Sequence, residues 1–401
     1  MNLQPAEKLS VTSRMLAMSC MTILRGPGEV YVQGTTGNAP ARQTTGWVER
    51  IDPESLATLK RSPDLEAGPY WPGGIAAHAN GSLYVTCGCW CHRLDPDCQP
   101  IASTELPRDK PYNSLVILPD GHLVMKDFAG GTGVHALEAD VRGSELCVLE
   151  PELLEIVHRY ELPEGSIARL SAGVAADETP MVYVIGERNA MRLRWDSSSL
   201  AVDDSWTTPY IRFDGQTFGW DVVLEAGSAW FLDNGEGTTA FGPSFRGKGT
   251  SPSPLHLVRI PLDVGHPEAE FLEVCGEPGG IIANPPAIDG SRRIAVGYDS
   301  GNGVMTAWRF GGPGKHERLW TREQNQAGHM IVFPDTGELM SYDYDHDRMT
   351  EQVVVLDIES GEEKGRVAIS SPLQCVVFPA AGENRDVYAT TFSTIARVFV
   401  E

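Results

Sequence analysis

Three polar side chains that could bind a metal ion occupy equivalent places along the chain. Asn113, Asp221 and Asn284 each precede or open a short apolar run, where a β-strand would begin. Amide and carboxylate oxygens are the hard ligands that Ca²⁺ and Mg²⁺ prefer. We therefore expect these residues to hold a divalent cation where the fold brings them together. The alternative is turn capping, because Asp and Asn also accept hydrogen bonds from the N–H groups of turns.

Two histidines are candidates for proton transfer. His329 precedes another apolar run of the same kind, and His135 lies in a long Gly-rich segment. Imidazole exchanges protons near neutral pH and is a common general acid or base. Asp127, which closes a strand-like run, is the third candidate catalytic residue. For a single histidine, the alternative is a hydrogen-bonded structural role.

Aromatic side chains near these positions would form the walls of a small-molecule pocket. The candidate substrate-binding residues are Tyr70, Trp71, Tyr112, Phe218 and Trp220, with Arg246 from a long loop. That loop also contains Phe241, Phe245 and Lys248, which is unusual aromatic and basic content for an acidic protein. It would suit an acidic or carbonyl-bearing substrate, and a flexible surface loop is the alternative.

A repeated strand pattern must position these residues. A short apolar run, a turn with Gly, Asp or Asn, and a second apolar run recur eight times, about every 51 residues, a period typical of repeat folds. Each repeat divides into four strands, A to D from the axis outward; the third has NSLVILP, HLVMKDF, SELCVLE and EIVHRYELP. Such repeats form the blades of a β-propeller. The sequence therefore predicts an all-β chain without helices, folded as one β-propeller domain over residues 1–401.

The two ends of the chain complement each other. The last repeat supplies only three strands, LQCVVFPA, RDVYATTF and TIARVFVE, and the N-terminal segment EKLSVTSRM belongs to no repeat. We expect this segment to be the outer strand of the last blade, because that closure removes exposed sheet edges. The prediction is an eight-bladed ring; a seven-bladed ring with one irregular hairpin is the alternative.

Propeller geometry brings the candidate residues to one face. The starts of the A strands and the ends of the B strands meet at one mouth of the channel. Five B strands end in a carboxylate: Asp127, Glu187, Asp233, Asp299 and Asp343. Like charges gathered there repel, and a bound cation or raised pKa values of the carboxyl groups would relieve this repulsion. The long B–C loops of the first, third and fifth repeats lie on this face, which favours ligand binding there.

The bulk composition excludes some partners. The formal charge is −22 and the pI about 4.8, so nucleic acid and anionic membrane surfaces are poor partners. No apolar run approaches the roughly 20 residues of a membrane span. The N-terminus lacks the basic start and long apolar stretch of a secretory signal. We expect a cytoplasmic protein with free thiols.

A cluster of cysteines needs its own interpretation. Cys87, Cys89 and Cys91 alternate, and on one strand they would project to the same side. This spacing is awkward for one tetrahedral zinc ion, which usually takes a C-x₂₋₄-C pair. Packing as small apolar side chains is favoured. Zinc with His92 and Cys98, or a Cys91–Cys98 disulfide, are the alternatives.

The stretch NSLVILPDGHLVMKDF resembles a blade of the senescence-marker-protein, gluconolactonase and strictosidine-synthase-like propellers. The resemblance implies a divalent cation at the channel mouth, held by Asn and Asp at A-strand starts, which Asn113, Asp221 and Asn284 match. Two features depart from that family. Its ring has six blades, and its first blade supplies a Glu where this chain has Ser19 and Cys20.

Together these patterns predict an enzyme that acts on a small molecule at the channel mouth. The reaction would be hydrolysis of a lactone or ester, or a related lyase or isomerase step. A Ca²⁺ or Mg²⁺ ion would polarise the carbonyl group, and His329 or His135 would move the proton. A non-catalytic propeller that binds another protein and a quinone-dependent oxidoreductase are the alternatives.

Overall fold

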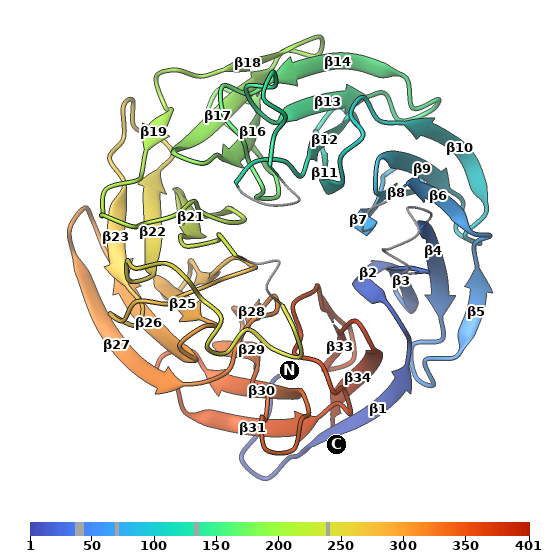
Figure 1. Cartoon of the computed structure of the whole chain (residues 1–401). Coiled ribbons are helices and arrows are strands. Elements are labelled where there is room, and N and C mark those ends of the chain that lie inside the picture. The colour runs from blue at the N-terminus through green and yellow to red at the C-terminus, as the bar shows by residue number, and fades with distance from the viewer. Residues whose placement is uncertain (37–43, 69–71, 132–135, 238–240) are drawn as a thin grey trace.

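The computed structural model describes residues 1–36, 44–68, 72–131, 136–237 and 241–401. Eight antiparallel sheets are arranged around a central axis, so the chain is an eight-bladed β-propeller (Figure 1). Within the described residues every regular element is a strand, and none is a helix that could span a membrane. The predicted fold class is confirmed.

The first four blades follow the A to D order from the axis outward. Blade 1 contains β2 (Ser19–Gly26), β3 (Glu29–Thr35), β4 (Thr44–Ile51), β5 (Thr58–Arg61) and β6 (Leu65–Gly68). Blade 2 contains β7 (Pro72–Ala77), β8 (Leu83–Cys87), β9 (Trp90–Leu94) and β10 (Pro100–Glu105). Blade 3 contains β11 (Tyr112–Ile117), β12 (Leu123–Asp127), β13 (Glu145–Leu149) and β14 (Ile156–Glu161). Blade 4 contains β15 (Ser171–Val174), β16 (Pro180–Ile185), β17 (Asn189–Trp195), β18 (Leu200–Val202) and β19 (Thr208–Pro209).

The other four blades complete the ring. Blade 5 contains β20 (Val223–Glu225), β21 (Ser228–Leu232), β22 (His256–Pro261) and β23 (Glu270–Glu273). Blade 6 contains β24 (Ala287–Asp289), β25 (Ile294–Asp299), β26 (Val304–Phe310) and β27 (His316–Glu323). Blade 7 contains β28 (Ile331–Phe333), β29 (Glu338–Tyr342), β30 (Gln352–Asp357) and β31 (Glu363–Ala368). Blade 8 contains β32 (Ala380–Ala381), β33 (Asp386–Thr390), β34 (Thr394–Val400) and, from the N-terminus, β1 (Leu9–Met15).

The N-terminal strand closes the ring as predicted. β1 pairs antiparallel with β34 over seven residues, from Leu9 opposite Val400 to Met15 opposite Thr394. The two ends of the chain thereby share one sheet, and β1 occupies the outer place that blade 8 would otherwise lack (Figure 1).

The core lies between neighbouring blades. B and C strands such as β12 and β13 are buried along their whole length, whereas outer strands such as β14 alternate exposed and half-buried residues. A strand between two sheets is covered on both faces, which explains the continuous apolar runs of B and C. Buried Trp195 keeps its polar atom paired, because Nε1 donates to Asp120 Oδ2 over 2.7 Å. This packing gives a rigid frame for the channel mouth.

The cysteine cluster differs from its predicted arrangement. Cys87 ends β8, Cys89 lies in the turn and Cys91 belongs to β9, so the three residues span a hairpin rather than one strand. Gly88 makes the tight turn, with a φ of 54°. All eight cysteines are free, which excludes the Cys91–Cys98 disulfide. Cys87 and Cys91 are completely buried and belong to different apolar clusters, which agrees with the packing interpretation.

Candidate functional site

The starts of the A strands converge at the channel mouth. Arg169 precedes β15 of blade 4 and Phe378 precedes β32 of blade 8, and these blades face each other across the ring. The Arg169 guanidinium carbon nevertheless lies 4.1 Å from the centre of the Phe378 ring, a cation–π contact. The side chains of opposite blades therefore meet on the channel axis.

Two further residues complete what we call the axial cluster: Arg169, Asp221, His329 and Phe378. Asp221 precedes β20 and accepts hydrogen bonds from the Arg169 main-chain N–H over 2.6 Å and from Nη1 over 3.1 Å. His329 precedes β28 and contacts Phe378 with 3.8 Å between ring centres and a tilt of 40° between the ring planes. Its Nε2 lies 3.9 Å from Asp221 Oδ2. A cation, a carboxylate and an imidazole from three blades thus share one site.

Burial shifts the ionisation of these groups. The pKa of Asp221 is raised because its carboxyl group is desolvated, although Arg169 and Lys126 act in the opposite direction. The pKa of His329 lies well below 6.5 because of burial and of the Arg169 charge. His329 is therefore a neutral imidazole at physiological pH, and about 20% of its side-chain surface remains exposed.

A buried lysine lies beneath the axial cluster. Lys126, on β12, is fully buried, and its ammonium group donates to the main-chain oxygens of Asp127 over 2.7 Å and Ser166 over 2.6 Å. Burial lowers its pKa to about 8, while the carboxylates of Asp127 and Asp221 act to raise it. Together with Arg169 it gives the mouth positive charge inside an acidic protein.

Several polar atoms at the mouth are buried without a hydrogen-bond partner among the described residues. They are Arg169 Nε, Trp220 Nε1, Asn284 Oδ1 and His329 Nε2. Each such atom costs about 1–3 kcal/mol unless something pairs with it, so four of them at one mouth favour a polar ligand there. Two are N–H donors, one is an oxygen acceptor and one is an imidazole nitrogen that can do either.

The three predicted cation ligands have protein partners. Asn113 Nδ2 donates to the Ile167 main-chain oxygen over 2.9 Å, and Asn284 Nδ2 donates to that of Ala327 over 2.6 Å. Both amides therefore link neighbouring blades, while Asp221 already pairs with Arg169. Within the part of the chain that the structure describes, no group of three His, Cys, Asp or Glu is placed to hold a metal ion. The two amide contacts use the nitrogens and not the oxygens that a cation would need, and a bound cation stays an untested prediction.

Other predicted site residues lie elsewhere. Asp127 is fully buried inside blade 3, where it accepts from Arg108 Nη1 over 2.9 Å and from the Glu145 N–H over 3.0 Å. Tyr112 is fully buried in the same blade and accepts from the Arg108 N–H. Both therefore stabilise blade 3 and lack exposed surface for a ligand. His135, Tyr70 and Trp71 lie outside the described residues.

The long loop of blade 5 covers part of the mouth. Residues 241–250, which we call the strap, contact blades 6 and 8. Phe245, only 2% exposed, packs on Ile281 and Ala327, and its N–H donates to Gln374 Oε1 over 2.9 Å. Arg246 donates to the Asn302 main-chain oxygen. Arg246 thus anchors the strap to blade 6, and the loop lies over the face on which a ligand was predicted.

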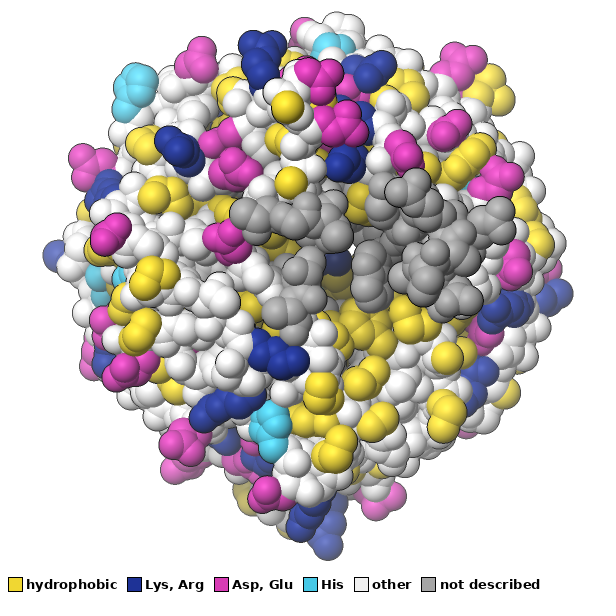
Figure 2. All heavy atoms as spheres, in the orientation of Figure 1, with side chains coloured by type: hydrophobic (Ala, Val, Ile, Leu, Met, Phe, Trp, Pro, Cys, Tyr) yellow, Lys and Arg dark blue, Asp and Glu magenta, His cyan; other side chains and the backbone are white. Residues whose placement is uncertain are grey.

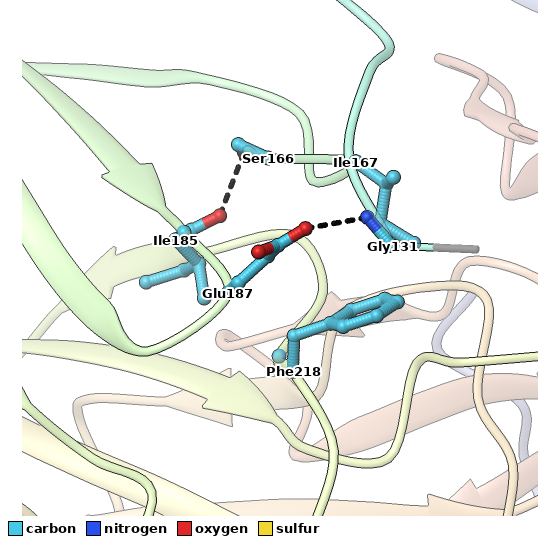
Figure 3. Close-up of a pocket in the computed structure, with 8 residues that line it drawn as sticks. Gly131, Ser166, Ile167, Ile185, Glu187 and Phe218 are labelled. Atoms are coloured by element: carbon cyan, nitrogen blue, oxygen red, sulfur yellow. Dashed lines mark hydrogen bonds between the residues drawn. The ribbon is translucent and has the colours of Figure 1, made fainter. Parts of the chain in front are cut away.

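An open pocket lies beside the axial cluster, between blades 4 and 5. Its volume is about 740 Å³, and its walls include Glu187, Ile211, Gln216 and Phe218. Figure 3 shows a smaller adjoining pocket that shares Gly131, Glu187 and Phe218 with this one. Phe218 lies below Gly131 and Glu187 there, and Ser166 and Ile167 also line it. Phe218 lines this pocket and precedes Asp221 of the axial cluster by three positions, so the pocket wall and the cluster are close along the chain.

The same face also exposes apolar surface. Figure 2 shows hydrophobic side chains gathered beside the mouth, over blade 8. Half-buried apolar residues in the connections on this face are Leu16, Leu373 and Phe392. Phe241 of the strap contacts Phe392 with 5.8 Å between ring centres.

Sequence reasoning missed three residues of this site. Arg169, Phe378 and Lys126 were not among the candidate residues. Lys126 carried a usable signal, because a lysine within the apolar run LVMKDF must have a specific buried partner or a cost in stability. The Arg169–Phe378 contact joins residues 209 positions apart in the sequence and needs the closed ring to appear.

Comparisons with known proteins confirm the fold. No protein-family model and no curated protein matches the sequence. BamB from Moraxella catarrhalis is similar with a TM-score of 0.60 and 11% identity, over 98% of this chain and 99% of that one. Sqt1 from Chaetomium thermophilum has a TM-score of 0.60 and 12% identity, over 96% of both chains. Streptogramin B lyase has a TM-score of 0.50 and 10% identity, over 98% of both. At such identities these similarities show a propeller, and the predicted family stays a prediction.

Proposed function

We propose that the protein is an enzyme that acts on a carbonyl-bearing small molecule at the channel mouth, as a lactone or ester hydrolase or a related lyase. The observation that carries this proposal is the axial cluster with its unpaired polar atoms. A merely solvated mouth would not need a desolvated carboxylate, a cation and a neutral imidazole within a few ångströms. Perturbed ionisable groups gathered in a cleft are typical of catalytic sites.

Each residue has a role that its position supports. Arg169 and the Trp220 indole would donate hydrogen bonds to the carbonyl oxygen and stabilise the negative charge that develops there. His329, as a neutral imidazole, would take a proton from the attacking water and return it to the leaving oxygen as the acyl C–O bond breaks. Asp221 would hold Arg169 in place and stabilise the imidazolium. The strap would limit the size of the substrate.

The pKa of His329 leads to a pH dependence. Because this pKa lies well below 6.5, the imidazole keeps its capacity to accept a proton into acidic solution. We expect the rate to fall only below the pH at which an ordinary histidine becomes protonated.

The test is turnover of a panel of aryl esters and lactones by purified protein. His329→Gln should lower kcat by about 10²–10⁴-fold, the usual contribution of a general acid–base group. His346→Gln is the matched control, since His346 is exposed on the same face outside the axial cluster. The proposal is rejected if no compound of either class is turned over, or if both variants keep full activity.

A second candidate is a binding platform for another protein. The apolar side chains over blade 8 favour it (Figure 2). Sqt1, a propeller of the same shape, has been solved with the N-terminus of the ribosomal protein L10 bound. For this candidate Phe392→Asp should abolish capture of a partner, whereas His329→Gln should not.

A further inference from the structure

The pocket between blades 4 and 5 contains one oriented carboxylate beside an aromatic ring. Glu187 lies in the turn that follows β16, and its Oε1 accepts from the Gly131 N–H over 2.5 Å (Figure 3). The Glu187 main-chain N–H donates to the Gly165 oxygen over 3.0 Å. One hydrogen bond therefore orients the carboxylate and the other fixes the backbone that carries it. Among the described residues no cationic side chain pairs with this carboxylate.

The aromatic wall is equally fixed. Gly131 packs so closely on Phe218 that a Cβ atom there would lie 3.0 Å from Phe218 Cζ. The ring is half-buried and lines the pocket together with Glu187. Any side chain at position 131 would enter this space, so the glycine keeps carboxylate and ring close to each other.

The charge around the pocket is mainly negative. Glu164, behind the same turn, accepts from the N–H groups of Arg188 and Asn189, and burial raises its pKa with a contribution from the Glu187 charge. Glu236 also lines the pocket, and Arg188 is its only cationic residue among those that the structure describes. A ligand that brings a positive charge would be attracted to this pocket.

We propose that this pocket binds the ammonium group of a small-molecule amine, with Glu187 as its counter-ion and Phe218 as its apolar wall. A volume of about 740 Å³ lies within the usual range for drug-sized ligands. A cation between a carboxylate and an aromatic face gains both the ion pair and the cation–π attraction. The chemical class is a primary amine on an aromatic or branched apolar body.

The position of the pocket indicates that the substrate of the proposed enzyme is itself an amine of this class. This second step rests on the proposed function. Gly165 contacts Glu187, and Arg169 lies four positions after Gly165 in the chain. Four residues span at most about 14 Å. An amine that carries an ester or lactone group at that distance would place its ammonium at Glu187 and its carbonyl at Arg169.

The binding test uses phenethylammonium and its neutral analogue 2-phenylethanol, titrated into the full-length protein and followed by NMR. Phenethylammonium should bind at least tenfold more tightly than the alcohol, and Glu187→Gln should remove that difference. Arg188→Gln is the control from the same turn. It changes the charge in the opposite sense and should not weaken binding of the amine probe. Equal binding of both probes to the wild type, or equal losses in both variants, would overturn the proposal.

Salt gives a measurement that needs no variant. Raising NaCl from 50 to 500 mM should weaken binding of the ammonium probe severalfold, because salt screens an ion pair near the surface. Binding of the alcohol should not change. Equal responses would contradict the proposal even if Glu187→Gln failed to fold.

The two proposals fail in different ways. If amines bind in a way that depends on Glu187 but no ester or lactone is turned over, the amine-binding proposal stands and the proposed enzymatic function is rejected. If neutral esters are turned over in a way that depends on His329 but amines are not preferred, the enzymatic function stands and the amine-binding proposal is rejected.

Discussion

Glu351 provides the sharpest test of the electrostatics of this protein. It is fully buried next to β30, where its two oxygens accept from the N–H groups of Gln352 and Cys375. Among the described residues no cation pairs with it, and the Asp343 charge adds to the effect of burial. Its pKa is therefore raised to about 8. At neutral pH this carboxyl group is largely protonated.

The sign of the pH effect follows from linkage. A carboxyl group whose pKa is higher in the folded state stabilises the protein below its unfolded pKa, and that stability is lost as pH rises through the folded pKa. The pKa of Glu351 is 4.5 in the unfolded state and about 8 in the folded state. This group alone therefore lowers the free energy of unfolding by about 4 kcal/mol between pH 5 and pH 9. The change in proton binding begins near pH 4.5 and is complete near pH 9.

Glu351→Gln removes the ionisation but leaves one main-chain N–H with a poorer acceptor, at a cost of about 1–3 kcal/mol. The variant should therefore be less stable than the wild type at pH 5 and more stable at pH 9, so that the two curves cross. Urea unfolding followed by tryptophan fluorescence at several pH values measures the difference. A difference that does not change with pH would refute the reasoning, since other titrating groups are common to both proteins.

Three other predictions concern the ring, the strap and the thiols. Deleting residues 1–16 removes the outer strand of blade 8 and should lower the melting temperature and cause aggregation through the open edge; a monomeric sizing profile with unchanged melting would contradict the closure. Phe245→Ala removes the buried anchor of the strap and should speed limited proteolysis within residues 241–250. Phe241→Ala, at a half-buried position, should have a smaller effect. Equal cleavage rates in the two variants would count against Phe245 as the anchor. With a thiol reagent Cys275, the half-buried cysteine, should react first and the fully buried Cys87 and Cys91 only on unfolding; fast labelling of the Cys275→Ser variant would disagree with the packing.

Much of the fold could be predicted because it depends on local patterns. Hairpin turns such as Asp120–Gly121, where Gly121 has a φ of 89°, are specified by a few adjacent residues. Their regular spacing gave the eight blades, and the unmatched strand EKLSVTSRM gave the closure with β34. The same reasoning failed at Gly88, because a tight turn inside a Cys-rich run is not distinguished from a strand by alternation alone.

The sequence predicted where two of the candidate residues lie, but not which side chains they contact. Asp221 and His329 do lie at the channel mouth, because every A strand starts there. What the sequence could not show is which partner each side chain takes. Asp221 meets the guanidinium of Arg169 from the neighbouring blade, and that choice depends on how side chains of adjacent blades meet rather than on spacing within one repeat.

The pairing of β1 with β34 also constrains the order in which the protein can fold during synthesis. The strand at residues 9–15 waits, without a partner, until residues 394–400 have left the ribosome. Blades 1 to 7 can collapse one after another, since each is continuous in sequence, whereas the last blade joins residues nearly 400 positions apart. Such a distant contact is slow to form. Until it forms, the edge of β34 stays open to other chains, so a chain in which residues 9–15 have not yet paired with residues 394–400 would be the species most in need of a chaperone.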